Sequence, residues 1–498
     1  MDSPLTARLF WRSLLLIALL GLGLRMLPLA ESLWLDELHT SWVISGDWEG
    51  LAKRARQGNN SPLYFWGMKL VVACFGDDEW TLRMPSVICG CAALCGIGVL
   101  VRRWSGSGLA GCVAALLVAL DRDMIFYATE ARPYAAAQLG CIGVFAVTMR
   151  LWRDFDWRDV WIWTALAALT IHLHITAGLF VAACLPPLTL AAWGHGAWKR
   201  LALMLITLMV LLAPLSLQLQ VIYARRPNWS IFIHSGTPLQ IIEILPIIPF
   251  GLVPLAIALA ANALLKDREA SERRSAWTAI YIWAIVATLT PIGIAWIGTY
   301  LEFTPLFLRR YLIGSQALLF VWAGLNIGRI DRLWVRAIGA VAMSASIFFF
   351  HLPDHWTHQR RQDWRGAVAM LDKMELPANT TLMISSRLIE AKDLTANDDG
   401  LADYCRLPVT AIYRPEREFR QVIPLRYGAS GDLMPWQLKL IAEPQTIVVL
   451  EPGGRDTVQV TAAELSKSIP WASTLRILDG NRGLQMILVE PAKDQRDK

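Results

Sequence analysis

The sequence predicts a polytopic α-helical membrane protein of about eleven transmembrane helices that ends in a small extracytoplasmic α/β domain. Of the 498 residues, 55% are hydrophobic and only 18% are charged, whereas roughly a quarter of an ordinary soluble domain is charged. Long apolar runs fill the first 350 residues. The pattern then changes to short helical and strand-like segments, which are typical of a soluble α/β domain.

Eleven apolar runs come close to the length of about 20 residues that a helix needs to cross a bilayer. The first lacks a small-residue cleavage site, so we expect a retained span and not a removed signal peptide. A transmembrane domain is therefore expected over residues 1–350, with a soluble domain over residues 351–498. The runs are residues 13–29, 84–101, 109–126, 134–149, 160–173, 176–192, 201–221, 241–265, 276–297, 311–328 and 338–350.

Basic residues predict the orientation, because short cytoplasmic loops carry an excess of Lys and Arg. A cytoplasmic N-terminus puts most of the clustered basic residues on the inner side and, with an odd number of spans, puts the C-terminal domain outside. This distribution explains the net charge of +6 without a nucleic-acid partner. The inner clusters are Arg8 with Arg12, Arg102 with Arg103, Arg150 with Arg153 and Arg158, Lys199 with Arg200, the basic residues from Lys266 to Arg274, and Arg329 with Arg332 and Arg336.

One apolar segment, "SPLYFWGMKLVVACF" at residues 61–75, does not fit a span. It is about fifteen residues long and is interrupted by Lys69, which suits an interfacial or re-entrant helix better. Counting it as a span would move every later basic loop to the outside. We therefore place it in one long external loop over residues 30–83.

The C-terminal domain shows a helix followed by short strands. "DWRGAVAMLDKM" begins at Asp363, a capping residue type, and has helical spacing. The runs "TLMIS", "VTAIY", "TIVVL" and "LQMILVE" read as strands. The domain contains no GxGxxG or P-loop motif, so no nucleotide-sugar or ATP site is expected there.

Several polar residues gather at the external ends of the predicted spans. Ionisable groups at membrane depth are costly and mark functional sites. Carboxylates accept a proton from a hydroxyl, whereas guanidinium groups suit a phosphate. A site with both would suit transfer of a group from a lipid phosphate to a hydroxyl. The residues are Asp36 and Glu37 in "ESLWLDELHT", Glu130 and Arg132 before Pro133 in "FYATEARPYA", His172 and His174 in "HLHIT", and Arg309, Arg310 and Tyr311 in "LFLRRY".

Seven motifs, in this order, resemble the bacterial form of the dolichyl-phosphate-mannose-protein mannosyltransferase and aminoarabinose-transferase-like group of membrane glycosyltransferases, the GT-C type. The resemblance covers residues 10–375. It implies transfer of one sugar, with inversion, from a polyprenyl phosphate to a glycolipid, polysaccharide or protein outside the cytoplasm, in a bacterial inner membrane. The motifs are "LWLDE", "NSPLYF", "EWTLRMPS", "YATEARPYA", "HLHITAGL", "RRYLI" and "DWRGAVAML".

The same resemblance implies roles for individual residues. Asp36 is expected to be the base that deprotonates the acceptor hydroxyl. The other acidic residues expected at the catalytic site are Glu37 and Glu130. The expected ligands of the donor phosphate are Arg132, Arg310, Tyr311, Arg309 and Arg83, and the candidate substrate contacts are Asn60, Tyr64, Tyr134 and His174.

The chain departs from the family pattern at one position. Where the bacterial pattern reads His-Pro-Pro before Leu-Tyr, this sequence has Asn60, Ser61 and Pro62, so any acid, base or metal role of that His is absent. Metal dependence stays open: Asp36, Glu37 and Glu130 carry the hard oxygen ligands that Mg²⁺ or Mn²⁺ prefers.

Plainer interpretations remain beside these. Asp36 and Glu37 are also what a helix N-terminus often carries, and Arg309 and Arg310 are also suitable interfacial anchors. Arg25, near the outer end of the first span, either snorkels or helps to bind phosphate. For the whole protein, the alternatives are a lipid-linked sugar flippase without bond-breaking activity and an inactive lipid-binding scaffold.

Overall fold

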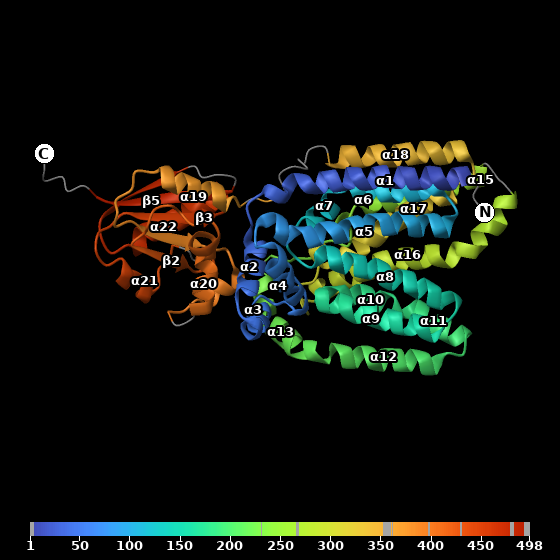
Figure 1. Cartoon of the computed structure of the whole chain (residues 1–498), viewed down its shortest axis with the longest axis horizontal. Helices are drawn as coiled ribbons and strands as arrows, with labels where there is room; N and C mark the ends of the chain where they lie inside the picture. The colour runs from blue at the N-terminus through green and yellow to red at the C-terminus, as the bar shows by residue number, and fades with distance from the viewer. Residues whose placement is uncertain are drawn as a thin grey trace. The chain divides into compact units, whose positions relative to one another are not determined.

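The structure is a computed structural model that describes residues 4–230, 232–264, 268–351, 360, 362–396, 399–428, 431–478 and 483–492. The chain divides into two compact units (Figure 1). The helical unit comprises Met1–Leu29, Asn59–Gly76 and Trp80–Thr357, and the mixed unit comprises Ala30–Gly58, Asp77–Glu79 and His358–Lys498. This division differs from the one expected at residue 350, because Ala30–Gly58, the first half of the predicted external loop, groups with the C-terminal residues.

The helical unit follows the order of the predicted apolar runs, each of which falls on helical structure. Its helices are α1 (Pro4–Met26), α4 (Leu63–Phe75), α5 (Glu79–Ser105), α6 (Gly108–Leu120), α7 (Arg122–Ala128), α8 (Tyr134–Arg153), α9 (Trp157–Leu173), α10 (Gly178–Ala183), α11 (Leu185–Gly194), α12 (Trp198–Leu212), α13 (Ser216–Ser230), α14 (Gln240–Glu243), α15 (Val253–Leu264), α16 (Arg268–Tyr300), α17 (Ile313–Arg329) and α18 (Leu333–His351).

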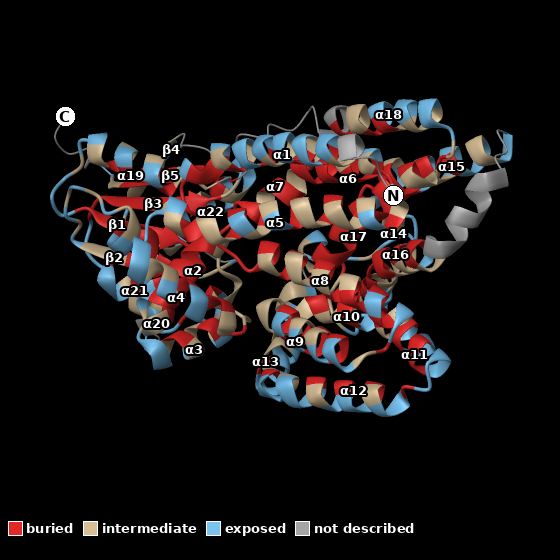
Figure 2. Cartoon of the chain, turned by 45° about the vertical axis from the view of Figure 1, so that its right-hand side comes forward, coloured by how far each residue is buried: buried red, intermediate tan, exposed pale blue. Residues whose placement is uncertain are grey.

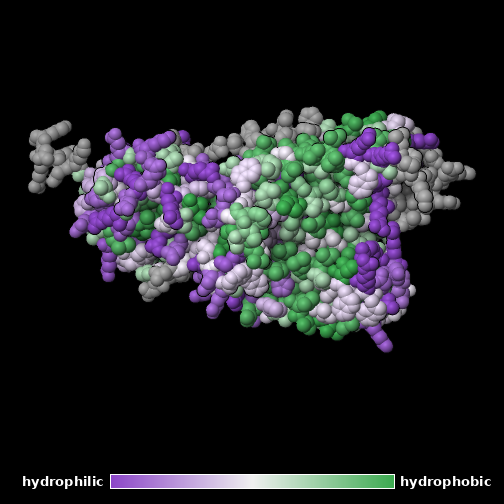
Figure 3. Space-filling view, viewed as in Figure 1, coloured by the Kyte–Doolittle hydropathy of each residue, from purple (hydrophilic) through white to green (hydrophobic). Residues whose placement is uncertain are grey.

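Six stretches of the described chain are long and apolar enough to cross a membrane: Ala7–Ala30, Glu79–Ser105, Tyr134–Arg153, Ile175–Gly194, Trp198–Ser230 and Thr278–Tyr300. Large apolar side chains also face outward on this unit (Figure 3), for example Met209 and Val210 on α12. Such an apolar surface is stable in contact with the hydrocarbon core of a membrane. The prediction of a polytopic helical membrane protein is confirmed, and the number of spans stays a prediction.

The core of the helical unit lies around α17 and α6. Every residue from Ile313 to Ile327 of α17 is buried, whereas much of α12 is exposed (Figure 2). Gly324 of α17 faces Ala114 of α6, and a Cβ at Gly324 would lie 2.7 Å from the Ala114 Cβ. Small residues at such contacts let helices in a membrane approach closely.

Two predicted runs contain breaks. Residues 109–126 form two helices, because α6 ends at Asp121 and α7 begins directly after it. The Asp121 carboxylate caps α7 by accepting a hydrogen bond from the Met124 N–H at 2.8 Å. Residues 176–192 are likewise divided at Cys184, just before two prolines begin α11. The segment over residues 61–75 contains α4, whose 13 residues span about 20 Å at 1.5 Å per residue. That length is too short to cross a hydrocarbon core of about 30 Å.

The mixed unit contains a five-stranded sheet with the strand order β2-β1-β3-β5-β4. β1 pairs in parallel with β2 and β3, and β5 pairs antiparallel with β3 and β4. Its strands are β1 (Thr381–Ser385), β2 (Gln421–Leu425), β3 (Ile447–Pro452), β4 (Ser473–Leu478) and β5 (Leu484–Pro491), and its helices are α2 (Leu35–Ser45), α3 (Trp48–Gln57), α19 (Trp364–Lys373), α20 (Asp399–Leu407), α21 (Pro435–Leu440) and α22 (Arg455–Ser468).

Three of the four predicted strands are confirmed, and so is the Asp363 cap, which accepts from the Gly366 N–H at 3.0 Å. The prediction of a strand at "VTAIY" is wrong. Pro408–Ile412 forms a π-helical turn that continues α20, in which the Tyr413 N–H donates to the Pro408 carbonyl.

Candidate active site

The first turn of α2 carries the two adjacent carboxylates, so the helix-terminus interpretation holds for their local structure. Acidic side chains at a helix N-terminus interact favourably with its dipole, and the Glu37 carboxylate accepts from the Trp34 N–H at 3.4 Å. Neighbours on a helix point about 100° apart. Glu37 is accordingly fully buried, whereas Asp36 is partly exposed.

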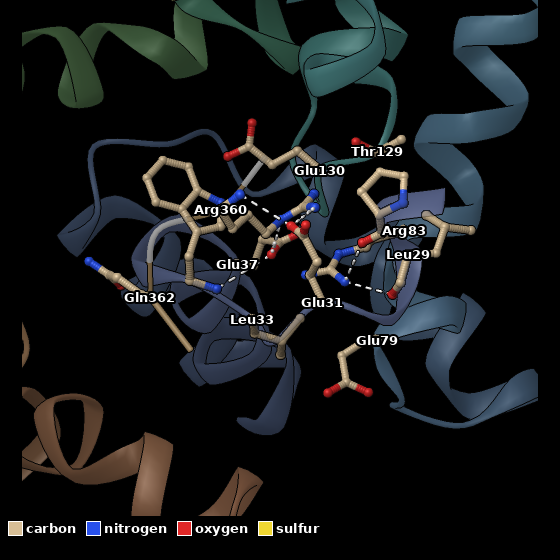
Figure 4. Close-up of polar contacts among 12 residues, drawn as sticks. Leu29, Glu31, Leu33, Glu37, Glu79, Arg83, Thr129, Glu130, Arg360 and Gln362 are labelled. Carbon is tan, nitrogen blue, oxygen red and sulfur yellow. Dashed lines mark hydrogen bonds and ion pairs between the residues drawn. The ribbon is translucent and has the colours of Figure 1, made fainter. Parts of the chain in front are cut away.

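Arg360 is the ion-pair partner of Glu37. Its Nε lies 2.9 Å from Glu37 Oε2, and the two side chains are 1% and 0% exposed. The same guanidinium lies 3.4 Å from Glu31 Oε2, which also accepts from the Arg360 backbone N–H at 3.1 Å. Figure 4 shows Arg360 between these two carboxylates.

The backbone before α2 is held by the C-terminal part of the same unit. Gln362 accepts from the Leu35 N–H at 2.9 Å, and the Tyr404 hydroxyl donates to the Leu35 carbonyl at 2.9 Å. The Tyr413 hydroxyl accepts from the Leu33 N–H at 2.7 Å, and burial raises the pKa of Tyr413 above its ordinary value of 10. Asp36 therefore lies in a segment whose conformation is fixed on both sides.

A cavity of about 300 Å³ adjoins this segment in the mixed unit. Charges of both signs line it: Arg360 pairs with Glu31 inside the lining, and Arg365 pairs with Glu79, which lies outside it. The Arg365 guanidinium also donates to the Ala30 carbonyl at 3.1 Å. The lining residues are Ala30, Glu31, Ser32, Arg360, Gln362, Asp363, Arg365, Gly366 and Ala369.

In the helical unit, the turn before α8 presents Glu130 and Arg132. The Ser86 hydroxyl of α5 donates to the carbonyl oxygens of both residues, at 2.6 and 3.1 Å. Both side chains are buried, Glu130 fully and Arg132 to 7% exposure. Pro133 immediately precedes α8. Two of the seven motifs, "EWTLRMPS" and "YATEARPYA", therefore contact each other, and this contact fixes the turn.

Arg132 contacts the residue that replaces the family histidine. Its Nη2 donates to Asn60 Oδ1 at 3.3 Å. The next residue, Ser61, lies 3.5 Å from the Nδ1 atom of His172. The start of the 61–75 segment, the turn before α8 and the end of α9 are therefore neighbours in the helical unit.

His174 joins a second group of candidate residues. Its ring lies 5.2 Å from the Tyr134 ring and 6.2 Å from the Tyr311 ring, between centroids. Burial, and then the nearby guanidinium groups of Arg132 and Arg310, lower the pKa of His174 from 6.5 to about 3. The ring is therefore neutral at physiological pH, and positive charge from two turns is concentrated around it.

Other predicted phosphate ligands are engaged elsewhere. Arg309 is exposed and forms an ion pair with Asp123 of α7 at 3.2 Å. Arg83 is fully buried, and its guanidinium donates to the Leu29 carbonyl at 2.7 Å (Figure 4). Tyr64 is buried, with its ring 5.3 Å from that of Phe65. Arg25 does not snorkel, because it is buried and donates to the Gly21 and Val118 carbonyls.

The two groups of candidate residues lie in different units. Asp36 and Glu37 belong to the mixed unit, whereas Asn60, Glu130, Arg132, His174, Arg310 and Tyr311 belong to the helical unit. Their convergence on one substrate is a part of the proposal below. Within the residues that the structure describes, no group of three or more His, Cys, Asp or Glu side chains is arranged to hold a metal ion.

Sequence reasoning missed Arg360 and Gln362. Both lie between the last apolar run and the predicted helix of the C-terminal domain, where polar residues are expected at any membrane exit. No spacing pattern connects them with a carboxylate more than 300 positions earlier. The available signal was one of position: they immediately precede "DWRGAVAML", the last of the seven motifs.

Comparison with known proteins finds one family model and several solved structures that are similar to this chain. Residues 59–223 match the family model of dolichyl-phosphate-mannose-protein mannosyltransferase. The crystal structure of ArnT from Cupriavidus metallidurans in the apo state aligns over 97% of both chains, with 15% identity and a TM-score of 0.56. The structure of ArnT from the same organism bound to undecaprenyl phosphate also aligns over 97% of both chains, with 14% identity and a TM-score of 0.52.

No match is found among curated proteins. The ArnT likeness establishes the fold, and the family match covers a segment that contains four of the seven motifs completely. The family match over residues 59–223 and the ArnT-like fold of the chain both agree with the resemblance predicted from the seven motifs.

Proposed function

We propose that this protein is a membrane glycosyltransferase that moves one sugar, with inversion, from a polyprenyl-phosphate donor to an acceptor outside the cytoplasm. The observation that carries the proposal is the cluster of Arg132, Arg310, Tyr311 and His174. The Arg310 guanidinium lies 5.8 Å from the centre of the Tyr311 ring, that ring lies 6.2 Å from the His174 ring, and Arg132 is held nearby by Asn60. Such a group at one end of a bundle of apolar helices suits a ligand with an anionic head and a long apolar tail. ArnT bound to undecaprenyl phosphate is a protein of the same fold with a ligand of this kind.

Arg132, Arg310 and Tyr311 are the proposed ligands of the donor phosphate. A guanidinium binds phosphate through two parallel hydrogen bonds. Asn60 holds the Arg132 guanidinium at 3.3 Å, and Tyr311 lies beside His174. The neutral His174 ring adds no further cation, so the two arginines remain the source of charge. Glu130, at the same turn as Arg132, is proposed to face the sugar or the acceptor.

Asp36 is proposed as the base, with Glu37 as its buried neighbour. The Asp36 carboxylate takes the proton of the acceptor hydroxyl, and the acceptor oxygen attacks the anomeric carbon on the face opposite the phosphate. The bond between that carbon and the phosphate oxygen breaks, and polyprenyl phosphate leaves as a stable anion. Stabilisation of this anion by the arginines replaces a general acid.

The location of the reaction follows from the proposed topology. With the N-terminus cytoplasmic and the basic loops inside, Asp36 and the arginine turns lie at the outer face of a bacterial inner membrane. An undecaprenyl-type carrier is the donor that fits this membrane. The acceptor class, whether glycolipid, polysaccharide or protein, depends on the shape of the acceptor pocket.

The test is donor turnover by purified protein. Wild type, Asp36→Asn and Arg132→Gln are incubated with a panel of polyprenyl-phosphate sugars and an extract of envelope glycans, and released polyprenyl phosphate is measured. Asp36→Asn should retain donor binding and lose about 10² or more in kcat, as expected when a positioned base is removed. Arg132→Gln should instead weaken donor binding.

Equal turnover by wild type and Asp36→Asn would contradict the role of the base. Sugar donors that cross proteoliposome membranes without release of polyprenyl phosphate would instead identify a flippase.

A further inference from the structure

Arg360 connects the carboxylate pair with the C-terminal part of the chain, and its contacts differ from those of a surface ion pair. The Arg360 and Glu37 side chains are buried, and the Nε to Oε2 distance is 2.9 Å. Two charges removed from water in this way are stable only as a pair, since either one alone would be an uncompensated charge. The position of Glu37 is therefore determined by Arg360.

The interaction extends over the whole segment that leads into α2. One guanidinium contacts both Glu31 and Glu37, which lie six residues apart on either side of the turn before the helix. Gln362 binds the Leu35 N–H, two residues further along the same C-terminal segment. Arg360 and Gln362 thus hold this turn through both side-chain and backbone contacts.

Asp36 lies between Leu35 and Glu37, and hydrogen bonds fix both of these neighbours. Leu35 before it is fixed through its N–H and its carbonyl, and Glu37 after it is fixed through its carboxylate. With both neighbours fixed, the φ and ψ angles of Asp36 are restricted, and so is the direction in which its partly exposed side chain leaves the helix. Arg360 thereby acts on the geometry of Asp36 through the adjacent residue.

We infer that Arg360 is a positioning residue of the transfer reaction: by holding the buried carboxylate of Glu37, it fixes the first turn of α2 and the direction in which Asp36 meets the acceptor hydroxyl. The inference rests on the proposed function. It assigns to the C-terminal domain a role in the chemistry, because the residue that orients the base belongs to the segment that begins this domain.

Kinetics separate this role from donor binding. Arg360→Ala should lower kcat by about 10²-fold, because a displacement of the base by about 1 Å costs that much. The KM for the donor should stay within about twofold of wild type, since the donor phosphate ligands are in the helical unit. The measurement is steady-state transfer from a polyprenyl-phosphate sugar that the wild type turns over, with donor binding measured separately.

Conservative and double variants exclude a general loss of folding. Arg360→Lys keeps the positive charge but has a single point of contact instead of a planar fork, so it should fold and lose about tenfold in kcat. The double variant Glu37→Gln with Arg360→Gln removes both fully buried charges, and only the partly exposed Glu31 loses its guanidinium partner. It should regain the thermal stability that Arg360→Ala loses, but not the wild-type kcat, because an amide pair does not hold the turn as firmly.

Arg476→Ala is the matched control. Arg476 pairs with Glu490 at 2.5 Å in the same unit, but both side chains are about half exposed. Its loss should leave kcat and KM unchanged, since exposed pairs contribute little.

The outcomes separate the inference from the proposed function. A wild-type kcat in Arg360→Lys, or in a folded Arg360→Ala, would overturn the positioning role and leave the transferase function intact. Absence of donor turnover by wild type would overturn the function itself. An equal change in kcat and in donor affinity in Arg360→Lys would show that Arg360 supports the fold of the site in general, and would also overturn the inference.

Discussion

The ring of His174 lies between two tyrosines and near two guanidinium groups, and this surrounding determines its protonation. The pKa of about 3 in the folded protein compares with 6.5 in an unfolded chain. Below pH 6.5 the unfolded chain therefore binds a proton that the folded chain does not bind until about pH 3. The stability associated with neutral His174 is fully present above pH 6.5 and is lost as the pH falls towards 3.

This pKa difference predicts a distinct acid sensitivity. Between pH 7 and pH 4, the melting temperature of wild type in detergent should fall more steeply than that of His174→Gln. His195→Gln is the control, because His195 is exposed and its loss should leave the wild-type slope unchanged. Parallel melting curves for wild type and His174→Gln across this range would contradict the pKa assigned to His174.

At this scale the residue types were predictable, but their partners were not. The motifs identified Asp36, Glu130, Arg132 and Tyr311, since ionisable and aromatic groups at a membrane boundary stand out from apolar surroundings. Arg360 was missed because the benefit of burying it depends on a carboxylate far away in the sequence. Arg83 and Arg309 were assigned to phosphate, yet the described contacts direct them to the Leu29 carbonyl and to Asp123.

At the scale of elements, α5 approaches α7 closely enough to require a glycine. A Cβ at Gly90 would lie 2.3 Å from the Ala128 Cβ and 3.3 Å from Nε of the buried Arg25. Such distances force a backbone shift, because Ala128 has no flexible side chain to move. The lack of a side chain at Gly90 therefore permits both the packing of α7 and the burial of Arg25.

Gly90→Ala should destabilise the protein by about 1–3 kcal/mol, the range expected for overpacking. Gly96→Ala in the same helix is the matched control, since a Cβ there meets no atom within 4 Å. Alanine is the better helix former by about 1 kcal/mol, so the control should be neutral or slightly stabilising. Thermal unfolding in detergent measures both variants, and equal melting temperatures would be the contrary result.

Elements with one dominant signal were predicted well. The apolar runs, the Asp363 cap and the strands at "TLMIS", "TIVVL" and "LQMILVE" depend on local composition or hydrophobic pattern. "VTAIY" was read as a strand because its residues favour strands, but its contacts with α20 decide otherwise. β2 and β4 were missed because Pro424 and alternating exposed residues weaken their apolar signal.

At the scale of the whole molecule, the proposed orientation depends on α4 not crossing the membrane. In a Cys74→Ser background, which removes an exposed native thiol, Asp77→Cys and Lys199→Cys report on opposite sides. A membrane-impermeant maleimide should label Asp77→Cys in cells with only the outer barrier opened, and should label Lys199→Cys only after the inner membrane is permeabilised. Labelling of Lys199→Cys in intact inner membranes would reverse the topology.

The sequence predicted a helical membrane part and a soluble α/β part, because composition changes abruptly between them. It did not predict that Ala30–Gly58 groups with the soluble part. That grouping arises from contacts such as Arg360 with Glu37 and Gln362 with Leu35. Long-range contacts of this kind leave no periodic pattern in either segment.

The central claim is that Asp36 and the arginine turns act on one donor. A structure of the protein with a non-hydrolysable polyprenyl-phosphate sugar bound tests it most directly. The account predicts phosphate oxygens at about 3 Å from the guanidinium groups of Arg132 and Arg310, with the Asp36 carboxylate facing the anomeric carbon from the opposite side of the sugar. A phosphate bound away from both arginines, or an Asp36 separated from the sugar by protein, would contradict it.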